Sequence, residues 1–316
     1  MNDGSSPGRE PATVAVVIPC WNDGDFLPEA IGSLRDDEGL ECVVVDDGST
    51  DPKTVDVLRK LEASGVRVIR QGANLGVSAA RNRGLAETSA PYVFPLDADD
   101  LAIPGAIAKM RARLDEHPEA AVCYGDSIDF GIHELVRAVP ATLDPYRLRY
   151  ANEYPMTALY RRSALEQLGG WQRLLPEIDS RQDWNLWLSL AESGAGAVYA
   201  GEGFLTHAYR TQAARLSSRG RAHHRRLSDA LAAQHPGVFT QVRLHRRRSS
   251  LSRPRRILYP FVYGRRRRSS LELRAKVALD RLGIWTLTGE MTEEQRRQLA
   301  RALAAGAAEA RRLASM

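Results

Sequence analysis

The 316-residue sequence has few cysteines, few lysines and no long apolar run. Its three cysteines form no C-x-x-C pair, which argues against a disulfide scaffold and a structural zinc site and fits a reducing compartment. No uncharged apolar stretch approaches the roughly 18–20 residues that a membrane-spanning helix needs. The N-terminal residues lack the basic and apolar regions of a signal peptide, so we expect a cytoplasmic protein.

Charge is unevenly distributed along the chain. Residues 216–316 carry 23 Lys and Arg against 7 Asp and Glu, a net charge of +16, whereas residues 1–215 carry 21 against 32, a net charge of −11. Opposite charges suggest separate roles for the two parts. We predict a disordered tail over residues 1–12, one domain over 13–215, and an Arg-rich, mostly helical extension over 216–316.

Short apolar runs alternate with amphipathic segments in the first half of the chain. This order predicts βαβ crossovers and an α/β fold with an open, mostly parallel twisted sheet. The expected strands are Val14–Ile18, Cys42–Val45, Val66–Ile69, Tyr92–Leu96 and Ala121–Tyr124. The expected helices are Leu27–Leu34, Pro52–Ala63, Ser78–Glu87, Pro104–Glu116, Arg181–Ala191 and Thr292–Leu313. Beyond about Leu216 the sheet pattern stops.

Polar residues gather where the predicted strands end. PCWN follows the first strand, DDGSTD the second, and Asp97-Ala98-Asp99-Asp100 the fourth. None of these loops is a G-x-G-x-x-G or a P-loop, which argues against a dinucleotide-binding Rossmann domain and a P-loop enzyme. Three carboxylates within four residues repel one another, and a divalent cation such as Mg²⁺ or Mn²⁺ relieves that repulsion. The alternative is a solvated acidic loop before the next helix.

The segments VVIPCWN, VVVDDGSTD, NLGVSAARNRGL and PLDADD, in this order, resemble those of family 2 glycosyltransferases with the GT-A fold, over about residues 13–215. The resemblance implies a nucleotide-sugar donor, with UDP as the default, a divalent metal (Mn²⁺ or Mg²⁺), and transfer with inversion at the anomeric carbon. It implies metal binding by Asp99 and Asp97, which correspond to the family's D-x-D motif. It also implies that the donor nucleotide is bound by Pro19, Trp21, Asn22, Asp46, Asp47, Arg81 and Asp97.

Two later segments also resemble the family. SRQDWNLW offers Asp183 as the base that accepts the proton of the acceptor hydroxyl, with Gln182 where a Glu is commoner. Glu177 and Asp179 compete for that role. LTHAYRTQAARLS offers His207 as a further metal ligand, and Arg210 and Arg215 as phosphate-binding residues.

Each of these assignments has a structural alternative. Trp21 could be a core residue, and Arg81 could form an intramolecular ion pair. Asp183 could favour the helix N-terminus through the helix dipole, and His207 could be a structural histidine.

The sequence therefore predicts a metal-dependent inverting glycosyltransferase whose acceptor is a glycan, a glycolipid or a small molecule such as a secondary metabolite. One alternative is a sugar nucleotidyltransferase, although PCWNDGD is not a Gly-rich, basic triphosphate loop. A second alternative is a catalytically silent nucleotide-sugar-binding protein, against which the intact set of acidic residues argues.

The basic C-terminal region suits either a solvated face or an anionic membrane at the inner face of the cell membrane. In the membrane case, we expect the apolar segment between the arginine runs to insert shallowly, through Ile257, Leu258, Tyr259, Phe261, Val262 and Tyr263. Nucleic-acid binding is not expected, because no nucleic-acid-binding motif accompanies the charge.

Overall fold

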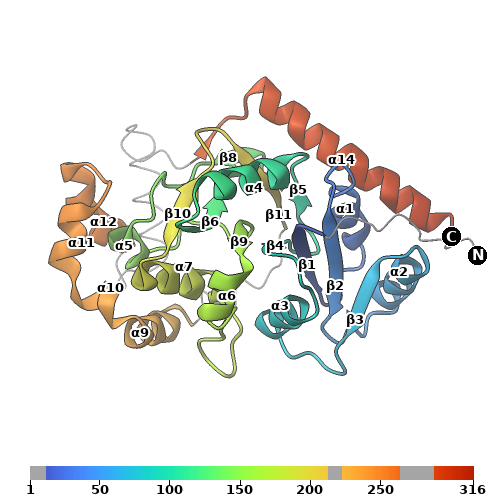
Figure 1. Ribbon diagram of the computed structural model, residues 1–316, viewed down its shortest axis with the longest axis horizontal. Coiled ribbons are helices and arrows are strands. Elements are labelled where there is room, and N and C mark those ends of the chain that lie inside the picture. Colours follow the sequence, from blue (N-terminus) through green and yellow to red (C-terminus); the bar gives the residue numbers. More distant parts are fainter. Residues whose placement is uncertain (1–11, 213–222, 264–287) are drawn as a thin grey trace, which may run out of the picture.

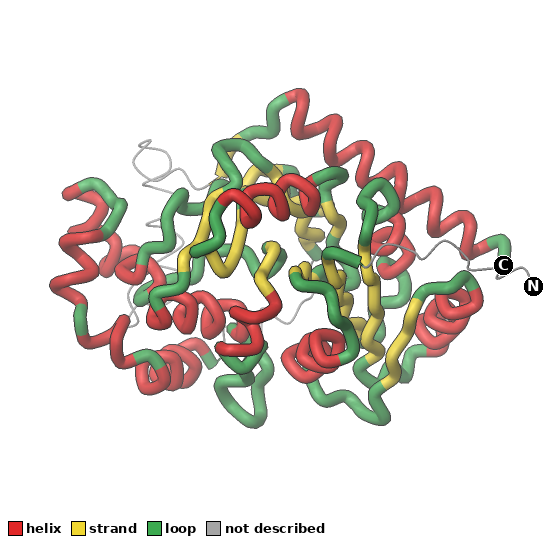
Figure 2. The backbone as a smooth tube through the Cα atoms, viewed as in Figure 1, coloured by secondary structure: helices red, strands yellow, loops and turns green. Residues whose placement is uncertain are grey.

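The computed structural model describes residues 12–212, 223–263 and 288–316. Its larger sheet has the strand order β10-β6-β9-β4-β1-β2-β3 and lies at the centre of the molecule, with helices on both sides (Figure 2). These strands are β1 (Val14–Cys20), β2 (Leu40–Asp46), β3 (Arg67–Arg70), β4 (Tyr92–Pro95), β6 (Ala120–Tyr124), β9 (Leu159–Arg161) and β10 (Gly196–Tyr199). The pairs are parallel except where β9 lies antiparallel between β4 and β6. The predicted α/β class with a mostly parallel sheet is confirmed.

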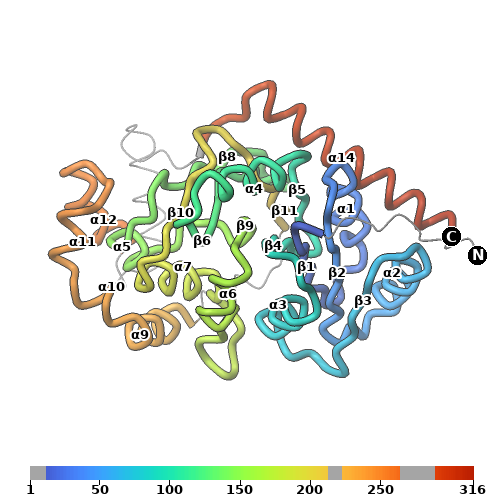
Figure 3. Tube along the Cα trace, viewed as in Figure 1, coloured from blue at the N-terminus to red at the C-terminus, as the bar shows by residue number. Residues whose placement is uncertain are grey.

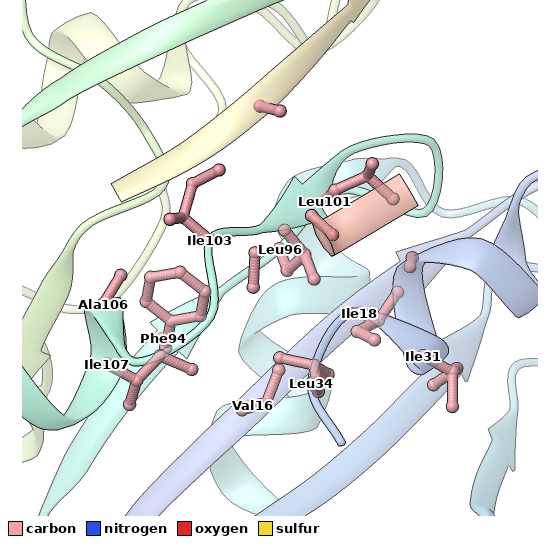
Figure 4. Packing of buried hydrophobic residues seen from close by; sticks show 14 of the residues in the cluster. Val16, Ile18, Ile31, Leu34, Phe94, Leu96, Leu101, Ile103, Ala106 and Ile107 are labelled. Carbon is pink, nitrogen blue, oxygen red and sulfur yellow. The ribbon is translucent and has the colours of Figure 1, made fainter. Parts of the chain in front are cut away.

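Two apolar cores explain why the strands are apolar throughout. Val16 and Ile18 on β1 face one core together with Phe94 on β4, and Figure 4 shows them packed near one another. Ala15 and Val17 face the other core. Since successive side chains of a strand point to opposite faces, a strand covered on both sides must be apolar at every position.

Helices of the first two-thirds of the chain cover these faces. Their bounds are α1 (Leu27–Gly32), α2 (Pro52–Ala63), α3 (Val77–Ala86), α4 (Ala106–Glu116), α5 (Pro145–Leu148), α6 (Arg162–Gln167) and α7 (Gln182–Ser193). The helices predicted from the sequence in this region are all present, most of them displaced by a residue or more at one end, which is the usual uncertainty of helix ends. Both α2 and α5 begin with a proline preceded by an aspartate whose carboxylate accepts backbone N–H groups, as helix starts favour.

A second sheet, which we did not predict, has the order β12-β8-β7-β11-β5. Its strands are β5 (Leu101–Ala102), β7 (Asp126–Gly131), β8 (Leu135–Arg137), β11 (Leu205–Thr211) and β12 (Thr288–Gly289). They are short or carry charged residues, so they give little periodic signal. Because β12 pairs with β8, the expectation that the sheet pattern stops beyond about Leu216 was wrong.

Apart from β12, the described parts of the C-terminal region are mostly helical, and their helices lie at opposite ends of the molecule (Figures 1 and 3). Next to α5 and α7 lie α9 (His224–Gln234), α10 (Pro236–Thr240), α11 (Val242–Arg248) and α12 (Arg253–Tyr263). The long helix α14 (Glu293–Ala314) instead returns to the first part of the fold and lies along α1. The region predicted as one extension therefore completes two separate parts of the protein.

Small residues allow α1 and α14 to approach closely. A Cβ atom at Gly32 would lie 2.7 Å from the Ala305 carbonyl oxygen, and one at Gly306 would lie 3.0 Å from the Glu29 Cα atom. Arg35, just beyond α1, pairs with the buried carboxylate of Glu309 on α14. No helix among the described residues is both long enough and apolar enough to cross a membrane.

Candidate functional site

The loops that follow β1 and β2 are joined by Asn22. Its side-chain Oδ1 accepts hydrogen bonds from the backbone N–H groups of Thr50 and Asp51, both at 2.9 Å, and its own N–H donates to Ser49 Oγ at 3.0 Å. Asn22 has φ +55°, a left-handed conformation that asparagine tolerates better than most residues. Asn22 therefore fixes the shape of the carboxyl edge of the sheet, where α/β proteins bind ligands.

The two aspartates at the end of β2 are buried and accept several hydrogen bonds. Asp46 accepts from the Ser49 N–H at 2.9 Å. Asp47 accepts from Gln71 Nε2 and the Leu75 N–H, both at 2.7 Å, and from the Gly76 N–H at 2.8 Å. Burial raises the pKa of Asp47, and these hydrogen bonds oppose the rise. The observed role of Asp47 is to hold the loop that leads into α3.

Two further residues were predicted in the nucleotide pocket: Pro19 is buried within β1, and Trp21 is 45% exposed. The exposure excludes the alternative that Trp21 is a core residue. An exposed tryptophan at the carboxyl edge of the sheet offers an apolar face to a ligand.

Asp179 and Glu177, which we considered as competing bases, have other partners. Asp179 accepts from the Ser78 N–H at 2.8 Å and from Ser78 Oγ at 2.6 Å, so its carboxylate satisfies the first turn of α3. Glu177 is exposed and pairs with Arg226.

Arg81 on α3 is the largest buried charged side chain of the site and is only 2% exposed. Its Nη2 lies 2.5 Å from Asp97 Oδ1, so the intramolecular ion pair that we considered is present. Its Nε and Nη1 are buried and have no hydrogen-bond partner in the described part of the chain. Unpaired buried donors are costly, and a guanidinium readily binds phosphate or carboxylate. The ion pair therefore leaves donors that an anionic ligand could use.

The acidic loop between β4 and β5 presents carboxylates in two environments. The Asp97 side chain is 34% exposed, whereas Asp99 and Asp100 are each 2% exposed. Burial and the nearby Asp97 raise the pKa of Asp100 well above its usual range. The backbone N–H of Arg210 donates to Asp100 Oδ1 at 2.9 Å, and Arg210 Nε donates to the Asp99 carbonyl at 2.8 Å.

His207 lies on β11, directly opposite Ala102, which follows the acidic loop. It is 5% exposed, and its Nδ1 lies 2.9 Å from Thr206 Oγ1. Burial lowers the pKa of His207 to about 4, against the opposing effect of Asp97, so the imidazole is neutral at physiological pH. Neutral imidazole is the form that binds metal ions.

Over residues 12–212, 223–263 and 288–316, no three His, Cys, Asp or Glu side chains converge as a ready metal cage. Such a cage is not required, since Mg²⁺ is commonly held by one or two carboxylates together with substrate phosphates. An acidic loop beside a neutral histidine and a buried arginine with unpaired donors fits an ion bound jointly by protein and diphosphate.

Asp183 lies in the first turn of α7. Its Oδ2 accepts a hydrogen bond from Asn152 Nδ2 at 2.9 Å. Asn152 was missed by the sequence analysis because it lies in an irregular segment with no motif. Arg181, the residue immediately before α7, has φ +63° and stacks on Trp184.

Of the two arginines predicted to bind phosphate, the structure describes Arg210 alone. Arg210 pairs with Glu29 and stacks between the rings of Phe26 and Phe130, so its guanidinium contacts the protein itself. Its phosphate contact stays a prediction. Arg215 lies outside the described residues.

Comparison with known proteins relates part of this sequence to a known family. Residues 15–169 match the sequence profile of glycosyl transferase family 2. This segment belongs to glycosyltransferase family 2. Among similar sequences, succinoglycan biosynthesis protein ExoU of Rhizobium meliloti is 27% identical over 202 residues, which are 58% of this chain and 58% of that protein. The chain thus spans little more than half of that relative.

Solved structures match over most of the chain. TarS residues 1–349 of S. aureus, in complex with UDP-GlcNAc, has a TM-score of 0.58 and 18% identity, covering 85% of this chain and 77% of TarS. Mannosyltransferase PcManGT of Pyrobaculum calidifontis, in complex with GDP-Man and Mn²⁺, has a TM-score of 0.54 and 16% identity. The match covers 95% of this chain and 87% of PcManGT. At these identities the likeness establishes the fold, which is the GT-A architecture that the motifs implied.

Proposed function

We propose that this family 2 glycosyltransferase is a metal-dependent inverting enzyme that moves a sugar from a nucleotide-sugar donor, with UDP as the first candidate nucleotide, to an acceptor hydroxyl of a glycan, a glycolipid or a small molecule. The observation that carries the proposal is Arg81, buried beside Asp97 with two unpaired guanidinium donors. A buried cation with free donors next to an acidic loop suits a diphosphate that an ion bridges to the carboxylates. The nucleotide-sugar complexes of TarS and PcManGT are consistent with it.

The residues have distinct roles in this proposal. Asp99 and Asp97 would hold the ion, with His207 as a further ligand, and a bound divalent cation would neutralise charge on the departing diphosphate. Trp21 and Pro19 would line the base, while Asn22, Asp46 and Asp47 shape the nucleoside pocket through the loops that they hold. Arg81 would donate to the diphosphate.

Asp183 would accept the proton of the acceptor hydroxyl as that oxygen attacks the anomeric carbon. The Asn152 amide N–H, donating to Asp183 Oδ2, leaves the other oxygen of the carboxylate for the hydroxyl. A positioned base contributes about 10²–10⁴-fold to such a step. Gln182, adjacent in the sequence, adds no charge, so Asp183 acts without a neighbouring carboxylate at that position.

The proposal is tested by measuring nucleoside diphosphate release from UDP-, dTDP- and GDP-sugars with Mn²⁺, with water or an added glycan as the acceptor of the sugar, in wild type, Asp183→Asn and Glu177→Gln. We expect release from one donor class, reduced about 10²–10⁴-fold in Asp183→Asn and unchanged in Glu177→Gln, which removes an exposed carboxylate from the preceding loop. Donor binding without release from any donor class in the wild type would favour the silent binding protein instead.

A further inference from the structure

The outward sides of α11 and α12 form a surface that we call the basic face. Its members are all exposed: Arg243, Leu244, Arg246, Arg247, Arg248, Arg253, Ile257 and Phe261. No Asp or Glu occurs in the sequence between Asp229 and Glu272. The stretch of sequence that forms the basic face therefore has basic but no acidic residues, together with exposed apolar side chains.

Helix α12 has apolar residues on two sides. Tyr259, Val262 and Tyr263 are buried in a small core with Tyr146 and Leu251. In the membrane case we expected all the apolar residues of this segment to insert, and burial excludes Tyr259, Val262 and Tyr263. On the outward side, Arg253, Ile257 and Phe261 are spaced four residues apart and so share one face. Ile257 is 54% and Phe261 55% exposed.

Hydrogen bonds connect α12 to the end of α11 that carries three consecutive arginines, Arg246 to Arg248. Arg256 Nη1 donates to the carbonyl of Arg246 at 3.1 Å and to that of Arg247 at 3.4 Å. This contact brings the C-terminal end of α11 next to α12, and Figure 1 shows both helices at the end of the molecule away from α14. The exposed arginines at the end of α11 and the exposed Ile257 thus lie on neighbouring helices.

We propose that the basic face docks the protein on an anionic membrane surface. Arginines attract anionic lipid head groups, while an exposed isoleucine and phenylalanine on one side of a helix insert shallowly among acyl chains. Phosphates of a nucleic acid would engage the arginines but would leave these apolar side chains in water. The combination of charge without acid and outward apolar residues favours the lipid surface.

Hydrogen bonds connect α12 to the segment that holds Asp183, the predicted base. Tyr259 of α12 donates its hydroxyl to Glu153 Oε2 at 2.5 Å, and Glu153 follows Asn152, the partner of Asp183. Arg147 Nε donates to the same Glu153 oxygen at 2.6 Å. A membrane on the basic face would meet the part of the molecule that carries Asp183, which would suit a lipid-linked acceptor; this last step rests on the proposed function.

The test is vesicle co-sedimentation of the full chain without donor or metal, so that its outcome does not depend on catalysis. Phosphatidylcholine vesicles with about one-third phosphatidylglycerol are compared with pure phosphatidylcholine. We expect binding to the anionic vesicles alone, weakened about a hundredfold by the triple change Arg246→Gln, Arg247→Gln and Arg248→Gln. We also expect it to weaken several-fold with Ile257→Gln and Phe261→Gln together, because the shallow insertion is lost.

The matched control is the triple change Arg296→Gln, Arg301→Gln and Arg311→Gln, which removes the same charge from exposed positions of α14. It should bind as the wild type does. Absence of binding to anionic vesicles in a folded wild type would overturn the proposal. Equal weakening by the control triple would also overturn it, as would a short DNA or RNA duplex that binds the basic face more tightly than the vesicles do.

Discussion

The Arg210 guanidinium on β11 lies 2.5 Å from the Glu29 carboxylate on α1, while its Nε donates to the Asp99 carbonyl. Arg210 therefore links the acidic loop to the helix on which α14 packs. The contact between α1 and α14 involves Gly306, whose would-be Cβ lies 3.0 Å from the Glu29 Cα atom. A C-terminal helix about 200 residues away in the sequence thus supports the acidic loop between β4 and β5.

Glu29→Gln should weaken Mn²⁺ binding in the presence of nucleotide about tenfold, because residues that orient metal ligands typically affect metal affinity by 10–100-fold when changed. Calorimetric titration of Mn²⁺ into the nucleotide-bound protein measures it. Arg35→Gln is the control, since it removes an ion pair between α14 and the residues just beyond α1 without touching Arg210. Equal affinities in Glu29→Gln and wild type would show that Arg210 does not position the loop.

Arg81→Lys keeps the positive charge and loses the guanidinium donors Nε and Nη1. We expect UDP affinity to fall about tenfold or more while uridine affinity stays unchanged, because only the diphosphate uses those donors. Fluorescence or calorimetric titrations with both ligands separate the two cases. Arg83→Lys, on the same helix but exposed and paired with Glu87, should change neither affinity. A parallel loss for uridine in Arg81→Lys would contradict the assignment.

Gly32→Ala should lower the free energy of unfolding by about 1–3 kcal/mol, because the added methyl group would meet the backbone of α14 at 2.7 Å. Gly72→Ala is the control, since a Cβ atom there meets nothing within 4 Å. Urea denaturation of the two variants measures the difference. Similar stabilities would mean that α14 does not pack rigidly on α1.

The carboxyl group of Asp37 makes the stability of the folded protein depend on pH. Burial raises the pKa of Asp37 to about 6, above the value near 4 expected in the unfolded chain. Between these values the folded protein keeps a proton that the unfolded chain has lost, so stability from this group is present below about pH 4 and is lost as pH rises through about 6. Asp37→Asn should remove about 2 kcal/mol of that pH dependence.

Urea denaturation at pH 4.5 and pH 7 tests the contribution of Asp37. Asp56→Asn, an exposed carboxylate on α2, should leave the difference between the two pH values as it is in the wild type. An unchanged difference in Asp37→Asn would show that this carboxyl group titrates alike in both states.

The sequence predicted β1, β2, β3, β4 and β6 of the larger sheet, because a sheet covered on both faces makes runs such as Val14–Cys20 apolar throughout. It did not predict β9 or β10, which are only three and four residues long. The second sheet was missed, since strands such as β7, with Asp126 and Asp129, have neither alternation nor a continuous apolar run. The loop residues of the site were found through motifs. Asn152 and the Arg210–Glu29 link were not, because they depend on contacts between distant segments that no local pattern records.

The central claim is that the acidic loop and Arg81 bind a nucleotide through a divalent ion. It is tested most directly by calorimetric titration of UDP, dTDP and GDP, each with and without Mn²⁺, into wild type and Asp99→Ala. We predict Mn²⁺-dependent binding of one nucleotide that is lost in Asp99→Ala. Failure of all three nucleotides to bind to a folded wild type, or equal binding by Asp99→Ala, would contradict the account.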